Sequence, residues 1–255
     1  MKLDFCSMVT HKREWNFLPI HFNSIKAYMP DDWSNFRVCV DIDDQDTINY
    51  CKQYPILDML KCKKYVQVDK PGGMKQDGYD TANRMDKLMK VCTSDWVVLS
   101  HLDIVFTGNM IEAIMPFLNE NYGVIGFWPL GCTIVNRKAY EDMHYGFWPI
   151  TCLTVEILSD LHARLCGVDT PRDKARKSYG LLGIDTGVFI TMEMPVYGFR
   201  HSLPPFVGGW HNYYYHIGGL GHAFTEGERD LDWAKEIFVR RDKALETFAS
   251  LRGEI

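Results

Sequence analysis

Short apolar runs rich in β-branched and aromatic residues alternate with segments of helical periodicity along the first half of the chain. The runs expected to be strands are residues 3–9, 36–42, 65–68, 96–99 and 124–128. Between them, apolar side chains recur three and four positions apart, as on one face of a helix, and helices are expected around residues 18–25, 85–92 and 111–118. This rhythm predicts an α/β fold, a Rossmann-like sheet with helices on both faces.

The alternation loosens after about residue 130. A helical stretch near residues 154–166, an apolar run at 181–190 and a segment rich in Pro, Gly and aromatic residues at 203–224 precede an amphipathic helix at about 230–251. With 255 residues and 46% hydrophobic residues, the chain can bury one large core. We expect subdomains 1–130 and 131–255, fused as one globular unit.

Composition narrows the class of protein. The eight cysteines show no CxxC spacing, which favours reduced core thiols over disulfides or a zinc site. The formal net charge of -5 gives no electrostatic footprint for nucleic acid, although a basic patch is present at residues 172–177. No run has the apolar length of a membrane span, and the N-terminus lacks the apolar centre of a signal peptide, so we expect a cytoplasmic protein.

Polar residues follow several of the predicted strands. The segment from Thr10 to Glu14 follows the first strand, Asp41 lies at the end of the second, and His101 and Asp103 follow the fourth. Parallel sheets bind ligands at the carboxyl ends of their strands, so these positions are candidates for a binding site. Asp41 is suited to accept hydrogen bonds from a base or ribose, and the alternative is a solvated acidic turn.

His101 and Asp103 stand two residues apart at the end of a buried run. Side chains two apart on a strand point to the same side, so both can converge on one ligand if the strand continues to Asp103. A carboxylate suits a hard divalent ion, and an imidazole fits Mn²⁺ better than Mg²⁺. The alternative is a buried histidine bonded to a backbone carbonyl beside an aspartate that caps the next helix.

The order of four segments resembles that of GT-A glycosyltransferases of the family-two type. The segments are Met-Val-Thr-His-Lys-Arg-Glu (8–14), Val-Asp-Ile-Asp-Asp-Gln-Asp (40–46), Thr-Ala-Asn-Arg (81–84) and Val-Val-Leu-Ser-His-Leu-Asp-Ile-Val-Phe (97–106). In this family the acidic motif after the fourth strand is usually Asp-x-Asp, and some members carry His-x-Asp, as here. The resemblance covers roughly residues 3–130.

The resemblance implies a nucleotide-sugar site built from these segments. Thr10 and Glu14 would border the base, and Asp41 would hold a uracil-like edge or its ribose, as expected for a UDP-sugar. Asn83 and Arg84 would lie beside the sugar diphosphate. His101 would lie near the ribose or the metal, and Asp103 would bind the Mn²⁺ or Mg²⁺ that spans the diphosphate.

Histidines return late in the chain between glycines, at positions 211, 216 and 222. Glycine permits close approach of the backbone, so these side chains are candidates for a further metal ligand or a phosphate clamp. A late histidine before a Gly-Gly pair is common in the family that the chain resembles, which favours His216, with His211 as the second candidate. The nearby tyrosines 213–215 are candidates to stack on a sugar or a base, and the alternative is aromatic packing with surface histidines.

Asp185 is the one acid in the apolar run 181–190. Burial would raise its pKa towards that of a general base, and inverting enzymes of this type deprotonate the acceptor with an acid from the later region. Asp185 is therefore the candidate catalytic base; Asp169 and Glu156 are rivals, and a helix cap is the structural alternative. Candidate acceptor-binding residues are Trp128, Trp148 and Trp210, although large aromatic residues also fill cores.

These features together predict a metal-dependent glycosyltransferase, a hexosyl or pentosyl transferase that acts by inversion. The acceptor hydroxyl is expected on a saccharide, or alternatively on a hydroxymethylated DNA base if the basic patch contacts phosphates. One alternative is a non-catalytic module of the same fold that binds a nucleotide sugar or a glycan. Another is a nucleotidyltransferase, which would ordinarily carry a glycine-rich phosphate loop after the first strand, and residues 10–14 contain no glycine.

Overall fold

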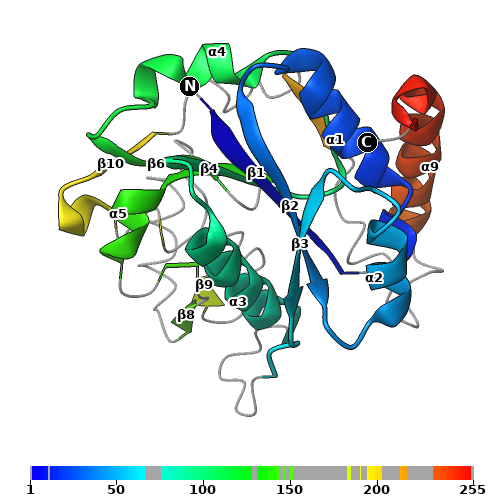
Figure 1. The fold of residues 1–255 in the computed structure, drawn as a ribbon, viewed down its shortest axis with the longest axis horizontal. Coiled ribbons are helices and arrows are strands. Elements are labelled where there is room, and N and C mark those ends of the chain that lie inside the picture. Colours follow the sequence, from blue (N-terminus) through cyan, green and yellow to red (C-terminus); the bar gives the residue numbers. More distant parts are fainter. Residues whose placement is uncertain are drawn as a thin grey trace. The chain divides into compact units, whose positions relative to one another are not determined.

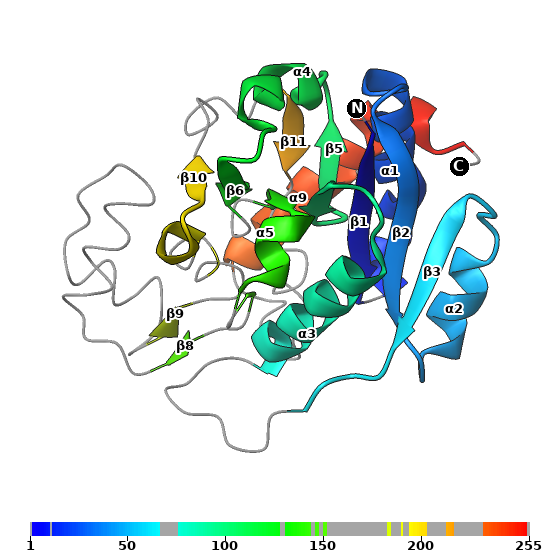
Figure 2. The same ribbon diagram turned by 60° about the vertical axis from the view of Figure 1, so that its left-hand side comes forward.

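The computed structural model describes most of the chain (Figures 1 and 2). The described residues are 2–10, 12–66, 76–127, 131–143, 146–147, 150–151, 183–184, 190, 194–202, 213–216 and 232–253. They belong to two compact units. The first consists of Met1–Lys63, Ser100–Ala113 and Gly209–Ile255, and the second of Lys64–Leu99 and Ile114–Gly208.

Parallel strands form the base of the first unit. β1 (Leu3–Val9), β2 (Trp33–Asp41) and β3 (Leu57–Cys62) lie side by side in that order and run in the same direction. Every residue of β1 is buried, whereas β3, the outer strand of the three, is buried only at Cys62. Val9 pairs with Val40, so the carboxyl ends of β1 and β2 lie next to each other.

Two helices connect these strands. The 3-10 turn η1 (Lys12–Glu14) and α1 (Phe17–Tyr28) follow β1, and α2 (Gln45–Cys51) follows β2. α2 begins where Asp44 accepts a hydrogen bond of 3.0 Å from the backbone N–H of Thr47. Trp15 stacks on Tyr50 with 4.5 Å between ring centroids, and its Nε1 donates to Thr47 Oγ1 at 3.2 Å. These contacts fix the start of α1 against α2.

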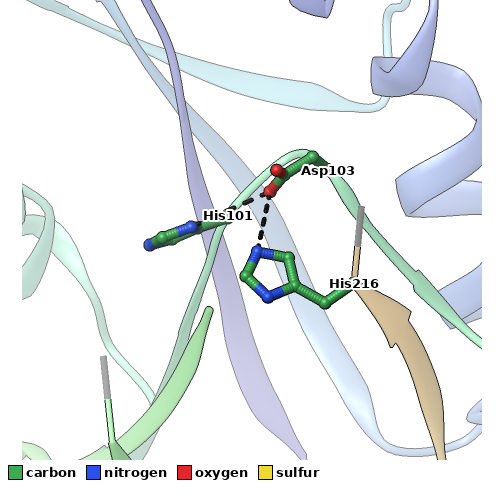
Figure 3. A group of neighbouring side chains, drawn as sticks. All are labelled: His101, Asp103 and His216. Atoms are coloured by element: carbon green, nitrogen blue, oxygen red, sulfur yellow. Dashed lines mark ion pairs between the residues drawn. The ribbon is translucent and has the colours of Figure 1, made fainter. Parts of the chain in front are cut away.

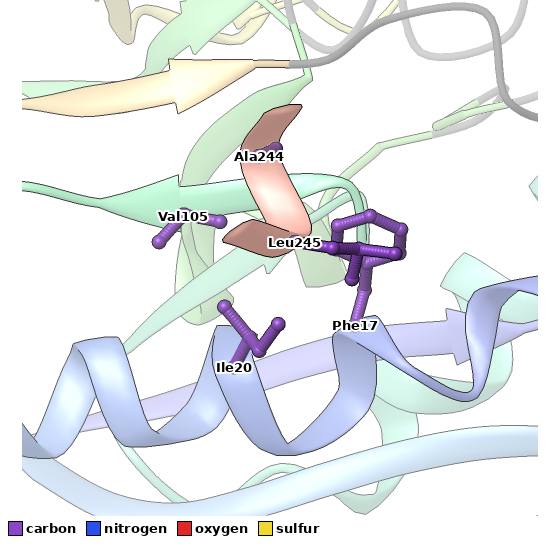
Figure 4. Packing of buried hydrophobic residues seen from close by; sticks show 5 residues of the cluster. All are labelled: Phe17, Ile20, Val105, Ala244 and Leu245. Carbon is purple, nitrogen blue, oxygen red and sulfur yellow. The ribbon is translucent and has the colours of Figure 1, made fainter. Parts of the chain in front are cut away.

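A second group of elements in the first unit comes from distant parts of the chain. β5 (Ile104–Phe106) pairs antiparallel with β11 (Tyr214–His216), and α4 (Met110–Ile114) follows β5. The C-terminal helix α9 (Asp232–Thr247) and the short turn η7 (Ala249–Leu251) complete the group. Figure 4 shows the cluster where α1, β5 and α9 meet, which is formed by Phe17, Ile20, Val105, Ala244 and Leu245.

The second unit contains β4, α3 and a set of shorter elements. The elements of this unit are α3 (Gln76–Val91), β4 (Trp96–Ser100), η3 (Met115–Phe117), β6 (Tyr122–Phe127), β7 (Cys132–Asn136), α5 (Arg137–Glu141), β8 (Ile150–Thr151), β9 (Gly183–Ile184), η5 (Met194–Tyr197) and β10 (Arg200–Ser202). β6 pairs antiparallel with β7 and parallel with β10, and β8 pairs antiparallel with β9. β4 ends at Ser100, where the chain enters the first unit.

The predicted α/β fold is confirmed, with two differences in its elements. The third strand is residues 57–62, whereas residues 63–66 lie outside any strand and Val66 is 67% exposed. An outer strand buries few side chains, so the apolar pattern of residues 57–62 is weak. The β-branched residues at 65–68 therefore gave the stronger sequence signal for a strand. The helix expected at 111–118 ends at Ile114 and continues only as η3, because Pro116 has no N–H to extend it.

Two predictions from composition concern the described residues. The six cysteines described there are buried and form no disulfide with one another, in agreement with the predicted core thiols; they are Cys6, Cys39, Cys51, Cys62, Cys92 and Cys132. No helix in the described part of the chain is both long and apolar enough to cross a membrane.

Candidate functional site

His101 and Asp103 come together through a tight turn between β4 and β5. The strand ends at Ser100, and the backbone N–H of Ile104 donates to the carbonyl of His101 at 3.3 Å. Leu102, between the two polar residues, is buried in the core. Nδ1 of His101 lies 3.8 Å from Oδ1 of Asp103. The two side chains therefore converge as predicted, but by a turn rather than by the alternation of a continuous strand.

His216 joins this pair through the β5–β11 ladder. His216 is the register partner of Ile104, the residue that follows Asp103, and its Nε2 lies 3.4 Å from Oδ1 of Asp103. Figure 3 shows both imidazoles facing the same carboxylate oxygen. The two rings approach edge to face, with 5.5 Å between their centroids.

Burial and charge within the group favour an ionised carboxylate. The side chain of Asp103 is only 9% exposed, whereas those of His101 and His216 are 31% and 24% exposed. Burial alone would raise the pKa of Asp103, but the interaction with His216 and the charge of His101 outweigh it, so the pKa lies below its ordinary value. The group thus presents a carboxylate beneath two imidazoles that solvent reaches.

The donor set suits a divalent transition metal. In the part of the chain that the structure describes, His101, Asp103 and His216 are the side chains grouped for metal binding, with all ligand atoms within 4.8 Å of one another. Nε2 of His216 is a buried atom that faces Oδ1 of Asp103 at 3.4 Å, so a cation bound between the two would have both atoms within reach as ligands. Two nitrogens and one oxygen fit Mn²⁺ better than Mg²⁺, which prefers oxygen alone.

Three buried polar residues next to the turn were not predicted from the sequence. They are Ser7 on β1, His21 on α1 and Ser100 at the end of β4. Each lies in a run of apolar residues, which indicates burial. Because a buried polar side chain requires a hydrogen-bond partner, this position was the sequence signal that could have found them. Their contacts surround the backbone that carries His101 and Asp103.

The residues expected to border the nucleotide base lie at the carboxyl ends of β1 and β2. Oε2 of Glu14 accepts hydrogen bonds from the backbone N–H of Thr10 at 2.7 Å and from its hydroxyl at 3.1 Å. Oδ1 of Asp41 accepts from the backbone N–H of Asp43 at 3.0 Å, and Asp41 stays partly exposed. Thr10 and Asp41 each follow one member of the Val9 and Val40 pair, so they are neighbours at this edge.

Asn83 and Arg84 lie on α3 in the second unit. Arg84 is buried and its Nε lies 2.7 Å from Oδ2 of Asp80, whose other oxygen accepts from the backbone N–H of Tyr65 at 2.7 Å. Asn83 is partly exposed. The guanidinium of Arg84 therefore holds α3 to the segment after β3, and its role beside a diphosphate remains a prediction.

Tyr214, one of the tyrosines that are candidates to stack on a sugar or a base, packs within the protein. It is buried on β11, and its ring meets that of Phe106 at a centroid distance of 6.0 Å. The ring of Tyr215 meets that of Phe248 at the same separation of 6.0 Å. The aromatic residues of β11 thus anchor the strand that carries His216.

Several predicted site residues lie outside the described residues. They are the candidate ligand His211, the candidate base Asp185 with its rivals Asp169 and Glu156, the candidate acceptor residues Trp128, Trp148 and Trp210, and the basic patch at 172–177. Their roles remain predictions from the sequence.

No protein-family model and no curated protein matches the sequence. Among solved structures, the chain is similar to the galactosyltransferase LgtC in complex with donor and acceptor sugar analogues, with 10% identity, a TM-score of 0.43 and coverage of 94% of this chain and 96% of LgtC. It is similar to the glycosyltransferase GlyE of Streptococcus pneumoniae TIGR4, with 11% identity, a TM-score of 0.45 and coverage of 99% of this chain and 62% of GlyE. It is also similar to the mannosyltransferase PcManGT of Pyrobaculum calidifontis in complex with GDP-Man and Mn²⁺, with 12% identity and a TM-score of 0.42. That match covers 81% of this chain and 56% of PcManGT.

Proposed function

We propose that the chain is a metal-dependent glycosyltransferase of the GT-A type that uses a nucleotide-sugar donor. The observation that carries this proposal is the group of His101, Asp103 and His216, which follows a strand end and combines one ionised carboxylate with two imidazoles. The resemblance of the sequence around Thr10, Asp41 and His101 to this family points in the same direction.

In this proposal each member of the group holds the divalent cation through one atom. Oδ1 of Asp103 and a ring nitrogen from each histidine would be the ligands, and Mn²⁺ is the expected ion. When bound, the cation would supply positive charge that stabilises a departing nucleoside diphosphate. His101 and His216 are only partly buried, so a substrate would have access to a cation held there.

Donor recognition is assigned to residues 1–130 and acceptor recognition to residues 131–255. Glu14 and Thr10 border the base, and Asp41 accepts hydrogen bonds from a uracil-like edge or its ribose, so a UDP-sugar is the expected donor. Asn83 and Arg84 are assigned to the sugar diphosphate. Asp185 is the general base that takes the proton of the acceptor hydroxyl, which then attacks the sugar carbon with inversion. The tryptophans Trp128, Trp148 and Trp210 line the acceptor side.

The acceptor is proposed to be a saccharide hydroxyl, with a hydroxymethylated base in DNA as the alternative. DNA binding would depend steeply on salt, because phosphate contacts release counterions, whereas saccharide binding would not. Measuring the Kd of each acceptor at two salt concentrations therefore separates the two alternatives.

The test is a screen of nucleotide sugars by thermal shift with and without Mn²⁺, because a bound donor stabilises the folded protein. A Mn²⁺-dependent rise in melting temperature with one donor class, together with donor hydrolysis or transfer, is the expected result. Asp103→Asn should abolish both effects, whereas Asp31→Asn, the same change at an exposed position just before β2, should leave them intact. Donor binding without turnover on any acceptor would instead identify a non-catalytic binding module.

A further inference from the structure

His21 lies on α1 and is completely buried, yet both of its ring nitrogens have polar partners. Nδ1 lies 2.7 Å from the carbonyl oxygen of Ile104, and Nε2 lies 3.0 Å from the hydroxyl of Ser100. Ser100 comes directly before His101, and Ile104 comes directly after Asp103. One imidazole therefore bonds to both ends of the turn that carries two of the three candidate metal ligands.

The chemistry of the partners fixes the proton on the ring. A carbonyl oxygen only accepts hydrogen bonds, so Nδ1 of His21 carries the hydrogen that it donates to Ile104. Burial lowers the pKa of His21 to about 4, so the ring is neutral at pH 7 and Nε2 accepts from the hydroxyl of Ser100. The hydroxyl of Ser7 donates to the carbonyl of Ser100 at 2.5 Å, which holds the same residue from β1.

α1 also supports the edge of β5 that does not face β11. The hydroxyl of Ser24, one turn after His21, accepts from the backbone N–H of Phe106 at 3.0 Å and donates to the carbonyl of His21 at 2.6 Å. Side chains of α1 thus bond to two backbone groups of β5, at Ile104 and Phe106. Because Ile104 is the register partner of His216, the bond from His21 also locates the third candidate ligand.

Polar side chains at fully buried positions weaken a core unless they are paired, and an apolar residue would fill the space of His21 without that cost. The bonds of His21 end on the residues that flank the ligands rather than on distant parts of the core. Hydrogen bonds that orient the ligands of a metal commonly change metal affinity roughly 10- to 100-fold when they are removed.

We propose that His21 is a positioning residue that holds the Ser100–Ile104 turn, and with it His101, Asp103 and His216, in the geometry that binds the cation. This inference rests on the proposed metal site. His21 itself touches neither the cation nor the substrate.

The test measures the Kd of Mn²⁺ by calorimetry or electron paramagnetic resonance on the full chain without donor. His21→Phe keeps the volume and removes both bonds, and it should weaken Mn²⁺ binding roughly 10- to 100-fold. His21→Asn, whose amide nitrogen takes the place of Nδ1, should bind Mn²⁺ more tightly than His21→Phe. Ile25→Val, which alters another buried residue of α1, should leave the Kd within about twofold of the wild-type value even though it lowers stability.

A milder pair of variants covers the case in which His21→Phe does not fold. Ser100→Ala removes only the hydroxyl that bonds to Nε2 of His21, and it should weaken Mn²⁺ binding roughly two- to tenfold, the size of one hydrogen bond. Thr133→Val removes a hydroxyl from a buried position on β7, outside the group that holds the turn, and should leave the Kd unchanged.

The outcomes separate this inference from the proposed function. A wild-type chain that fails to bind Mn²⁺ would overturn the metal site and the positioning role with it. A wild-type chain that binds Mn²⁺, with an equal Kd in Ser100→Ala and in any folded His21→Phe, would overturn only the positioning role. An Nε2-protonated ring for His21 in nitrogen NMR spectra at pH 7 would also overturn it, because the bond to Ile104 requires hydrogen on Nδ1.

Discussion

Nε2 of His216 lies 3.4 Å from Oδ1 of Asp103, although the two residues come from segments far apart in the chain. The contact exists because β11 pairs with β5 in a register that sets His216 opposite Ile104. His101 approaches the same oxygen from the other end of the turn. A carboxylate that meets two imidazoles on one oxygen brings together ligand types that divalent transition metals accept.

Replacing His101 by Asp should change which metal the group prefers. The imidazole favours Mn²⁺, whereas a second carboxylate supplies the oxygen ligand that Mg²⁺ requires. In His101→Asp the preference for Mn²⁺ over Mg²⁺ should fall by about tenfold, which corresponds to ~1.4 kcal/mol. Calorimetric titration of both ions measures the ratio of the two Kd values, and an unchanged ratio would mean that His101 does not contact the ion.

The neutral, buried His21 makes stability depend on pH. Its pKa is lowered from 6.5 to about 4 in the folded chain, so between these values the unfolded chain binds the extra proton and acid favours unfolding. Its contribution is complete above pH 6.5 and falls as the pH drops towards 4. From pH 7 to pH 5 the wild type should lose roughly 2 kcal/mol more than His21→Phe, as measured by urea unfolding. Parallel losses in the two proteins would contradict the buried neutral ring.

An ion pair on the strands of the first unit gives a separate test of the fold. Nη1 of Arg37 lies 2.8 Å from Oδ2 of the fully buried Asp4, and Asn35 donates to the other oxygen at 2.6 Å. Arg37→Met leaves this carboxylate without its cation and should cost roughly 3–5 kcal/mol in the free energy of unfolding. The double change Asp4→Asn with Arg37→Met should cost less than Arg37→Met alone. A double variant whose cost equals the sum of the costs of Asp4→Asn and Arg37→Met would show that the two residues are not coupled.

The C-terminal helix is held by the apolar cluster drawn in Figure 4. Leu245 on α9 packs there against Phe17 and Ile20 of α1. Leu245→Ala should lower the free energy of unfolding by roughly 2–4 kcal/mol because it leaves a cavity. Val239→Ala changes a residue of the same helix that is 68% exposed, and it should stay within about 0.5 kcal/mol of wild type. Equal effects in denaturant unfolding would contradict the docking of α9 on α1.

The strands β1, β2, β4 and β6 were predictable because each is a compact apolar run. β3 was not, since its half-exposed Leu57–Cys62 segment mixes charged and apolar residues while the more regular 65–68 run follows it. The convergence of His101 and Asp103 was predicted from strand alternation, whereas the structure achieves it with a turn around the buried Leu102.

His216 could be selected only through the resemblance to a family, because nothing in the local sequence gives the register of β11 on β5. His21 and Ser100 were missed for a related reason. Their partners, the carbonyl of Ile104 and the ring of His21, lie far along the chain, and long-range hydrogen bonds leave no local pattern. Local propensity thus predicts the elements, and their pairing determines the site.

The most direct test of the central claim is a Mn²⁺ titration of the wild-type chain beside Asp103→Asn, with Asp31→Asn as the matched control. A single Mn²⁺ ion should bind to His101, Asp103 and His216. Loss of the Asp103 carboxylate should weaken that binding by at least roughly 100-fold, because removing a ligand should cost no less than removing a residue that only orients one. Asp31→Asn should bind as the wild type does. No saturable Mn²⁺ binding by the wild type, or an equal Kd in Asp103→Asn, would contradict the claim.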